Sequence, residues 1–387
     1  MSGQVFFARP RERVAERGGI DAPLLCLVLV LLLFGALMSF SASSVYAERF
    51  YGDSAYFFKR YLIFALLSVL ISTPFVLFAK PAFWRLFGVL LYGVALFLLV
   101  LVLLIGTVGG GAKRWLVIGP LTIQPSEVAK LALIAVLALS FSRHEGEVLS
   151  GKRRGGSFRY GVLMPALLML PICLLVAAEK HISGLMILCM LGVLIMFLGG
   201  TRLRYLFMMG GAVALAGIFL IAVSSYAQVR VETWLHIEEV DPLGSAWQTL
   251  QGLYAIGSGG FFGVGLFEGR QKHGYVAEPQ NDFIFTVICE ELGFLGALAV
   301  LLLFAAVVIR GFRMSLRAPD RFSALLICGI CGKLALQAIL NVAVVTNSMP
   351  NTGVALPFFS SGGTFLAMQI FEMGIVLSLS RYCTHKR

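Results

Sequence analysis

Polar side chains gather in one short segment between two long apolar runs. The segment, GGGAKRWLVIGPLTIQPSEVAK at residues 109–130, contains Lys113, Arg114, Trp115, Gln124, Ser126, Glu127 and Lys130. Its second proline is expected in the first turn of a helix, so the glutamate and the lysine three residues later share one helix face. That face enters the apolar region carrying charge. The alternative is that the arginine and tryptophan anchor the interface and that the glutamate and lysine form a helix-end ion pair.

A second polar group surrounds the start of a later apolar run, EPQNDFIFTVICEELGF at residues 278–294. Asp282 stands at the mouth of the expected helix, and Glu290 follows about 12 Å further along its axis. At 3.6 residues per turn Glu290 lies about 80° around from Asp282, so both are predicted to face one cavity while Glu291 points away. A carboxylate within hydrocarbon costs about 2.5 to 3.5 kcal/mol, which favours a functional role. The alternative for Asp282 is a helix N-cap.

The third candidate segment is NSMPNTGVALPFFSSGGTFL at residues 347–366, which joins the last two apolar runs. Its prolines and glycines exclude a regular helix, and irregular backbone at membrane depth is tolerated where it lines protein or a wet cavity. We therefore expect one wall of a site here, with Ser360 and Ser361 among its hydroxyl groups. An ordinary tight hairpin is the alternative.

Two more charged residues fall near the middle of the last two apolar runs. Lys333 and Glu372 lie on runs that are neighbours in the sequence and antiparallel. We predict that they pair, because each alone would be costly in lipid. His181, in the polar EKHISG stretch, is interpreted as an interfacial hydrogen-bonding residue, since no second histidine or cysteine accompanies it as a metal ligand.

The elements that must position these residues are membrane-spanning helices. Of the 387 residues, 59% are hydrophobic and 13% are charged, whereas an ordinary soluble domain is about 25% charged. Apolar runs long enough to cross about 30 Å of hydrocarbon recur along the whole chain. We place ten spans at roughly 24–45, 61–79, 83–106, 126–142, 161–178, 182–200, 203–224, 283–309, 322–346 and 362–380. The predicted fold class is all-α, a polytopic membrane protein with about ten transmembrane helices.

The distribution of basic residues predicts the orientation. With the N-terminus inside, the N-terminal arm, the loops on the same side and the C-terminal tail hold 20 of the 31 Lys and Arg residues. The positive-inside rule places these segments in the cytoplasm and a large loop at 225–282, between spans seven and eight, outside. The net charge of +11 therefore reflects topology, and no nucleic-acid partner is expected.

The expected organisation is a cytoplasmic arm at 1–23, a single membrane domain at 24–383 and a cytoplasmic tail at 384–387. A cleaved signal peptide is the alternative for the first span, whose apolar run is longer than the typical 7 to about 15 residues of a signal. The sequence contains no GxxxxGK[ST] phosphate loop, so ATP is not the expected energy source. The seven cysteines form no repeated ligand pattern, and no metal site is predicted from them.

Five motifs, in order along the chain, resemble one known family. They are GAKRWLVIGPLTIQPSEVAKLALI, EKHISG, YAIGSGGFFGVGL, EPQNDFIFTVICEELGF and NTGVALPFFSSGGT. Together they look like the SEDS proteins (shape, elongation, division and sporulation), and the resemblance covers essentially the whole chain. The GAKRW form and the GPLTIQPSE block look closer to the FtsW/SpoVE branch than to RodA.

Several single residues match the family's motifs. Asp282 matches the essential aspartate, Arg114 and Trp115 match an R-W pair, and Glu127 and Lys130 match the P-S-E-x-x-K helix. The sequence departs from the family pattern at Ala277, Gln280-Asn281 and Ser361, and the run LFEGRQKHGYV is also atypical. These departures put the details of acceptor contacts in doubt.

The resemblance implies a peptidoglycan glycosyltransferase that polymerises lipid II at the outer face of the bacterial cytoplasmic membrane, beside a class B penicillin-binding transpeptidase. The lipid-linked donor already lies among the membrane lipids, which suits a chain without a nucleotide-binding domain. Asp282 is expected to act as general base, with its pKa raised by Glu290. Arg114, Lys130 and the backbone amides of 257–265 are expected to stabilise the departing diphosphate. A divalent cation such as Mg²⁺ or Mn²⁺ could share that task, but the sequence shows no closed ligand set and predicts no definite cofactor.

Two functions from other classes remain open at the level of sequence. One is a transporter that flips the same lipid and uses intramembrane acids for proton coupling. The other is a scaffold that activates a transpeptidase partner without chemistry of its own.

Overall fold

The protein folds as a bundle of long apolar helices. The computed structural model describes residues 17–109, 112–119, 121–150, 156–239, 244, 246–360 and 362–383. Within these residues nine helices are long and apolar enough to cross a membrane, and one shorter apolar helix, Ile182–Leu198, accompanies them. The predicted fold class is confirmed. Nine of the ten predicted spans correspond to helices long enough to cross a membrane, and the predicted span at 182–200 corresponds to the shorter helix Ile182–Leu198. The predicted cytoplasmic tail and residues 1–16 of the predicted arm lie outside the described residues.

The helices and strands follow one another in a fixed order along the chain. They are α1 (Ala22–Tyr51), α2 (Tyr56–Phe78), α3 (Pro81–Ile105), β1 (Thr107–Gly109), β2 (Ala112–Ile118), β3 (Leu121–Ile123), α4 (Pro125–Arg143), α5 (Glu145–Ser150), α6 (Gly156–Phe158), the π-helical turn η1 (Arg159–Leu163), α7 (Met164–Ala178), α8 (Ile182–Leu198), α9 (Leu203–Val223), α10 (Ser225–Leu235), α11 (Trp247–Gly259), α12 (Ile284–Ser315), α13 (Arg321–Val345) and α14 (Gly363–Ser380).

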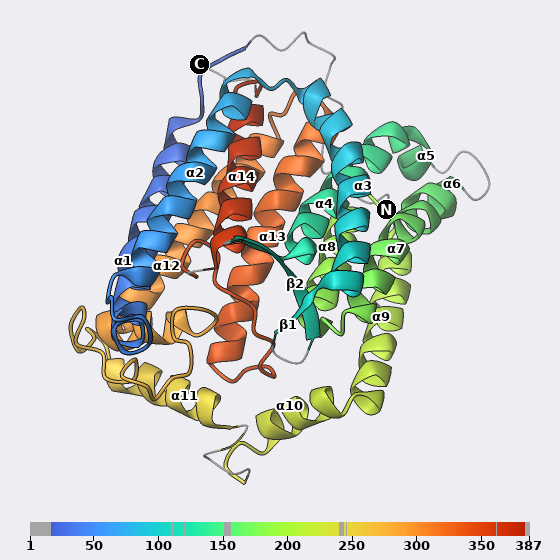
Figure 1. Ribbon diagram of the computed structural model, residues 1–387. Coiled ribbons are helices and arrows are strands. Elements are labelled where there is room, and N and C mark those ends of the chain that lie inside the picture. The colour runs from blue at the N-terminus through green and yellow to red at the C-terminus, as the bar shows by residue number, and fades with distance from the viewer. Residues whose placement is uncertain are drawn as a thin grey trace.

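Three helices form the protein-enclosed centre of the bundle. In α4 and α13, 83% of the most apolar window is buried within the protein, and in α14 the share is 78%. The same share is 17% in α2 and 6% in α9, whose side chains are left to contact lipid. Figure 1 shows α13 and α14 in the middle of the bundle and α9 at its edge. The charged residues Glu127, Lys130, Lys333 and Glu372 all belong to the three central helices, as the cost of charge in lipid requires.

The two described ends of the chain meet at one end of the bundle. The backbone N–H of Gly18 donates to the carbonyl of Arg381 at 2.7 Å. The helices α10 and α11 lie at the opposite end (Figure 1). The predicted outer loop at 225–282 contains these two helices, Ser225–Leu235 and Trp247–Gly259.

A small antiparallel sheet replaces the loop predicted between α3 and α4. Its strand order is β1-β2-β3, and Thr364 of α14 donates from its hydroxyl group to the carbonyl of Thr122 in β3. The sheet is thereby fixed to the central helices at the end of the bundle where α3 ends and α4 begins.

The helix α12 is interrupted where α11 crosses it. Gly293 has φ 65° and ψ −163°, a conformation that excludes ordinary side chains. The backbone N–H groups of Phe294 and Leu295 then donate to Gly260 and Phe261 instead of continuing the helix. A Cβ atom on Gly259 would lie 1.9 Å from the carbonyl oxygen of Cys289, so the two segments pack backbone against backbone.

This crossing generates a first prediction. Gly259→Ala should lower the free energy of unfolding by about 1 to 3 kcal/mol, because the added methyl group overpacks the contact with α12. The matched control is Gly257→Ala in the same helix, where nothing lies within 4 Å of the added Cβ atom and alanine should be neutral or better by up to about 1 kcal/mol. Thermal unfolding of the purified protein in detergent measures both. Equal melting temperatures for the two variants would contradict the prediction.

Candidate active site

A polar cavity of about 490 Å³ opens among the sheet, the central helices and the segments at the α10 and α11 end of the bundle. It has four cationic side chains and three carboxylate side chains in its wall. The cations are Arg60, Arg114, Lys130 and Arg230, and the carboxylates are Glu127, Glu278 and Asp282. The three sequence segments that were selected as candidates, 109–130, 278–294 and 347–366, all contribute to this one cavity.

Arg114 and Trp115 both line the cavity because β2 contains a bulge. Successive residues of a regular strand point to opposite faces. The pairing of β1 with β2, however, shifts from Val108↔Lys113 to Thr107↔Trp115, which leaves Arg114 as an extra residue in the ladder. Such a bulge re-aims the side chains beside it. Lys113 is exposed and is not among the cavity-lining residues, so its predicted role in substrate binding is not supported.

The start of α4 supplies the deep end of the cavity. Gln124, Glu127 and Lys130 line it as predicted, and Lys130 Nζ lies 2.5 Å from Glu127 Oε1. Both side chains are almost fully buried, so they form an ion pair at the cavity floor. Ser126 is buried but is not among the cavity-lining residues, so its predicted role in substrate binding is not supported.

The predicted pair in the middle of the bundle is confirmed and is part of a larger cluster. Lys333 Nζ lies 2.6 Å from Glu372 Oε1 and 3.6 Å from Glu127 Oε2. The charges of α4, α13 and α14 are therefore connected in one buried group that continues from the cavity floor toward the bundle centre.

A hydrogen bond to its backbone carbonyl fixes the position of Asp282 in the cavity wall. The buried side chain of Asn341 donates from Nδ2 to the carbonyl of Asp282 at 2.7 Å and to that of Val354 at 2.8 Å. This amide thereby joins α13, the start of α12 and the irregular segment that precedes α14. Asp282 is not the N-cap of α12, which is Phe283, so the alternative of a capping aspartate is wrong.

The pKa of Asp282 is raised to about 6. Burial is the largest cause, and the nearby charge of Glu278 adds to it, whereas a backbone hydrogen bond and Arg230 act in the opposite direction. The carboxyl group is thus mostly ionised at neutral pH and still basic enough to accept a proton.

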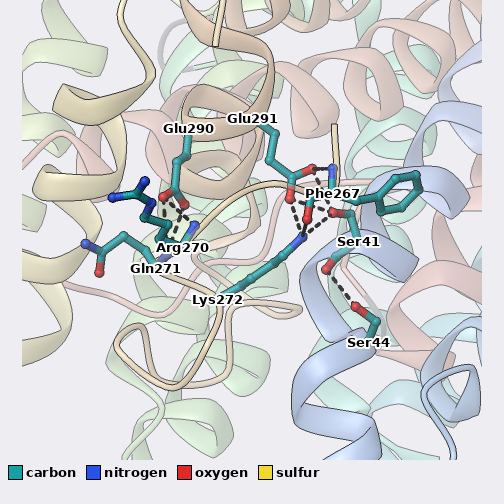
Figure 2. Close-up of polar contacts among 8 residues, drawn as sticks. All are labelled: Ser41, Ser44, Phe267, Arg270, Gln271, Lys272, Glu290 and Glu291. Carbon is teal, nitrogen blue, oxygen red and sulfur yellow. Dashed lines mark hydrogen bonds and ion pairs between the residues drawn. The ribbon is translucent and has the colours of Figure 1, made fainter. Parts of the chain in front are cut away.

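Glu290 does not face the cavity, so the prediction that it shares one cavity with Asp282 is wrong. Its carboxylate accepts hydrogen bonds from the backbone N–H groups of Arg270 and Gln271, at 2.8 Å and 3.2 Å to Oε1. Figure 2 shows it turned toward the loop that precedes Asp282. Glu278, and not Glu290, is the carboxylate that raises the pKa of Asp282. The helical projection failed because the loop folds back over the first turns of α12 and surrounds the carboxylate.

Glu291, which was predicted to point away from Asp282, holds the same loop as Glu290. Its Oε1 lies 2.6 Å from Lys272 Nζ, and Ser41 of α1 donates its hydroxyl hydrogen to the same carboxylate (Figure 2). The 257–265 backbone is also occupied, since the N–H groups of Val264 and Gly265 donate to carbonyls of α12. Neither 257–265 nor Glu290 is among the cavity-lining residues, so the expected contact of those amides with a diphosphate is not supported.

The irregular segment before α14 forms one wall of the cavity, as predicted. Thr352, Gly353 and Ser360 are part of this wall, whereas Ser361 lies outside the described residues. Ser183 of α8 fixes the segment by donating to the carbonyl of Thr352, and Arg230 of α10 donates to that of Asn351. The alternative interpretation of this segment, an ordinary tight hairpin without a part in a site, is therefore wrong.

Sequence reasoning missed Arg60 and Arg230 as cavity residues. Both lie outside the three candidate segments, Arg60 beside Lys59 near the start of α2 and Arg230 within α10. An arginine close to the end of an apolar run, on the same side as Arg114, was the available signal for Arg60.

His181 and Glu179 complete the electrostatics beside Arg114. Burial, together with the charges of Arg114 and Lys130, lowers the pKa of His181 to about 3. Burial raises the pKa of Glu179 to about 8, although Arg114 acts against this shift. Both groups are thus neutral near pH 7, and the histidine in the cavity wall is a neutral imidazole. An arginine beside two neutral groups is suited to hold an anionic ligand.

The described residues contain no cluster of three or more His, Cys, Asp and Glu side chains that could hold a metal ion by themselves. Glu278 and Asp282 are the two carboxylates at the cavity mouth. Mg²⁺ is commonly bound through one or two carboxylates together with substrate phosphates and water, so these two residues could contribute to such a site only with a phosphate-bearing ligand present.

The fold and the cavity define a class: a multi-pass helical membrane protein with carboxylate and several cationic side chains in one cavity. The chain matches the family model FTSW_RODA_SPOVE, described as cell cycle protein, over residues 22–385, and it belongs to this family. Stage V sporulation protein E of Bacillus subtilis is 38% identical over 365 residues, which cover 94% of this chain and 97% of that protein. A probable peptidoglycan glycosyltransferase FtsW of Trichlorobacter lovleyi is 38% identical over 372 residues, which cover 95% of this chain and 94% of that protein.

Solved structures of related proteins have the same fold. The rod shape determining protein RodA of Thermus thermophilus is 27% identical with a TM-score of 0.68, over 95% of this chain and 98% of that chain. A chain from a structure described as "Structural coordination of polymerization and crosslinking by a peptidoglycan synthase complex" is 28% identical with a TM-score of 0.75, over 94% and 98%. The predicted resemblance to the SEDS family is thereby confirmed.

The raised pKa of Asp282 generates a second prediction. The pKa of this group is about 6 in the folded protein against an ordinary value of 3.8. The stability that it contributes is therefore fully present at low pH and is lost as the pH rises through 6. Above pH 7, Asp282→Asn should therefore have a higher free energy of unfolding than the wild type, by at most about 3 kcal/mol, and so a higher melting temperature. This gain should nearly vanish at pH 4.

The matched control is Asp53→Asn, which removes a surface pair with Lys59. The pKa of Asp53 is lowered, chiefly by its hydrogen bond with Lys59, so this variant should gain no stability at high pH. Thermal unfolding in detergent at pH 4 and pH 8 checks both variants. A gain in Asp282→Asn that is the same at both pH values would contradict the predicted ionisation.

Proposed function

We propose that this protein is a peptidoglycan glycosyltransferase that polymerises lipid II into glycan strands at the outer face of the bacterial cytoplasmic membrane. Relatives that share most of their length with the chain are named as probable peptidoglycan glycosyltransferases. The observation that carries the proposal is that Asp282 shares one cavity with Arg114 and Lys130. A base and anion-binding cations in one cavity are what transfer from a diphosphate donor requires.

In the proposed mechanism Asp282 is the general base. It accepts the proton of the acceptor sugar's 4-hydroxyl group as that oxygen attacks the anomeric carbon of the donor. The new glycosidic bond forms while the bond between the anomeric carbon and the diphosphate oxygen breaks. A base whose pKa is about 6 is suited to this step, because it is mostly ionised at neutral pH and yet takes up a proton readily.

The cationic side chains stabilise the diphosphate that leaves. Arg114 presents a planar guanidinium group that can bind two phosphate oxygens at once, and Lys130, Arg60 and Arg230 add further positive charge in the same wall. Fixed cations at the site where negative charge develops lower the barrier without reorganisation. Gln124 and Trp115 belong to the same wall and are proposed to contact the sugar or the lipid headgroup.

The membrane orientation follows from the same proposal. The cavity faces outward, and the two chain ends lie in the cytoplasm, where the positive-inside rule places the basic segments. The donor reaches the cavity from the bilayer and brings its own activated bond, so no nucleotide is consumed. A divalent cation held by Glu278, Asp282 and the diphosphate is compatible with the carboxylates present and is proposed as an optional aid.

A class B penicillin-binding transpeptidase is the proposed partner. One solved chain with the same fold comes from a peptidoglycan synthase complex that joins polymerization with crosslinking. A glycan polymerase and a transpeptidase act on successive forms of one polymer, so a shared complex shortens the path between them.

The third prediction tests the reaction itself. Purified wild-type protein, alone or with its transpeptidase, should convert lipid II into glycan polymer, and Asp282→Asn should lower the rate by at least about 10²-fold, which is the usual contribution of a general base. Electrophoresis of labelled product measures the polymer. Movement of lipid II across vesicles without polymer would favour a transporter, and polymer that appears only from a catalytic partner would favour a scaffold.

The fourth prediction concerns pH. Since the base acts in its ionised form, kcat/KM should fall as the pH decreases through about 6, the pKa of Asp282. The Glu278 charge raises that pKa, so Glu278→Gln should move the acidic limb of the profile toward lower pH. Glu268→Gln, which removes an exposed carboxylate outside the cavity, is the control and should leave the profile unchanged. An acidic limb that does not move in Glu278→Gln would contradict the assignment.

A further inference from the structure

Four charged side chains are buried in two layers beneath the cavity. Glu127 and Lys130 line the cavity floor, whereas Lys333 and Glu372 lie below them and do not reach the cavity. None of the four is more than 4% exposed. With two acids and two lysines, the cluster is neutral as a whole when all four are ionised.

The carboxylate of Glu127 is shared unequally between the two lysines. Its Oε1 lies 2.5 Å from Lys130 Nζ. Its Oε2 accepts no hydrogen bond within the described part of the chain and lies 3.6 Å from Lys333 Nζ. Lys333 in turn donates to Glu372 at 2.6 Å. Each lysine therefore has one close carboxylate, and Lys333 also has a second one just beyond hydrogen-bond distance.

This arrangement bears on how Lys130 can serve an anionic ligand. In the structure its charge is already used by Glu127. Moving Lys130 toward a phosphate would leave a buried carboxylate without a counter-ion, which is strongly unfavourable. A lysine that contributes to binding from this position therefore needs a second cation that can take its place at Glu127.

We propose that Lys333 is this reserve counter-ion. When a diphosphate enters the cavity, Lys130 turns from Glu127 toward the phosphate oxygens, and Lys333 closes its 3.6 Å gap to Glu127 Oε2 to about the 2.8 Å of a charged hydrogen bond. After the shift Lys333 lies between the carboxylates of Glu127 and Glu372 and is shared by both. Lys333 is thus a positioning residue that acts through Lys130, and the inference rests on the proposed function of the cavity as a diphosphate site.

A purely structural ion pair would not need this geometry. Replacing a buried pair by apolar side chains of similar volume is often neutral or stabilising, so the Lys333–Glu372 pair by itself gives no clear advantage to the fold. The position of Lys333 between two carboxylates, one of which is on the cavity floor, is what distinguishes it from a simple pair.

The experiment measures the binding of farnesyl diphosphate to the full-length protein in nanodiscs, with farnesyl monophosphate as the reference ligand. The paired variant Lys333→Met/Glu372→Met keeps the net charge, and it should bind the diphosphate about tenfold more weakly, which corresponds to about 1.4 kcal/mol. In a Lys130→Met background the same paired change should have no further effect, because the reserve cation then has no lysine to release.

The charge-swapped variant Lys333→Glu/Glu372→Lys keeps the inference testable if the apolar variant does not fold. The swap retains the mutual ion pair, but it places a carboxylate beside Glu127 and should weaken diphosphate binding at least as much, which is measured on the fraction of the protein that elutes as a single folded species. If the swapped protein binds the diphosphate as the wild type does, or if the paired apolar change weakens binding equally without Lys130, Lys333 does not act through Lys130 and the inference is overturned.

A second readout separates this inference from the proposed function. Asp282→Asn should still bind farnesyl diphosphate, since the base is not needed for binding, although it forms no polymer from lipid II. A wild type that polymerises lipid II while the paired variants bind and polymerise equally well would reject the reserve counter-ion alone. A wild type that neither binds the diphosphate nor forms polymer would reject the proposed function itself.

Discussion

The structure depends on one constraint, the cost of placing charge inside a membrane-spanning bundle. A charged side chain at this depth is tolerated where it has a partner and is enclosed by protein. The central helices α4, α13 and α14 satisfy this condition for Glu127, Lys130, Lys333 and Glu372, which pair across the three helices. These helices are also the ones most enclosed by the protein. Their burial and the polar cavity above them are therefore two consequences of the same buried charges.

The cavity mouth is built by irregular backbone that the bundle alone would not provide. Asn341 ties Asp282 to the segment before α14, and the bulge in β2 turns Arg114 and Trp115 to the same side. On the other side of Asp282, the carboxylates of Glu290 and Glu291 hold the loop that leads to it. Rigid supports of this kind are needed because a base and its anion-binding partners must keep their geometry through the reaction.

The sequence was sufficient for the fold class, the ten apolar helices and the three segments that meet in the cavity. These predictions succeed because they depend on local composition: a long apolar run must span, and polar residues beside it must be enclosed. The prediction that Glu290 faces the cavity was wrong because a loop that folds back on α12 surrounds its carboxylate. A helical projection contains no information about that loop. The orientation of Arg114 depends on one extra residue in a strand pairing. No residue type in the segment predicts this bulge. Arg60 was missed because it becomes a site residue only when α2 packs beside α14.

Burial sets the charge of the cavity as much as the residue types do. The same desolvation that raises the pKa of Glu179 to about 8 and of Asp282 to about 6 lowers that of His181 to about 3. At neutral pH, Glu179 therefore no longer neutralises the guanidinium of Arg114, and His181 does not compete with it for an anion. Asp282 remains mostly ionised under the same conditions because its pKa of about 6 lies below neutral pH, whereas that of Glu179, about 8, lies above it. A single physical effect thus sets both the neutral groups beside Arg114 and the raised pKa of Asp282, and both suit the proposed transfer from a diphosphate to a hydroxyl group.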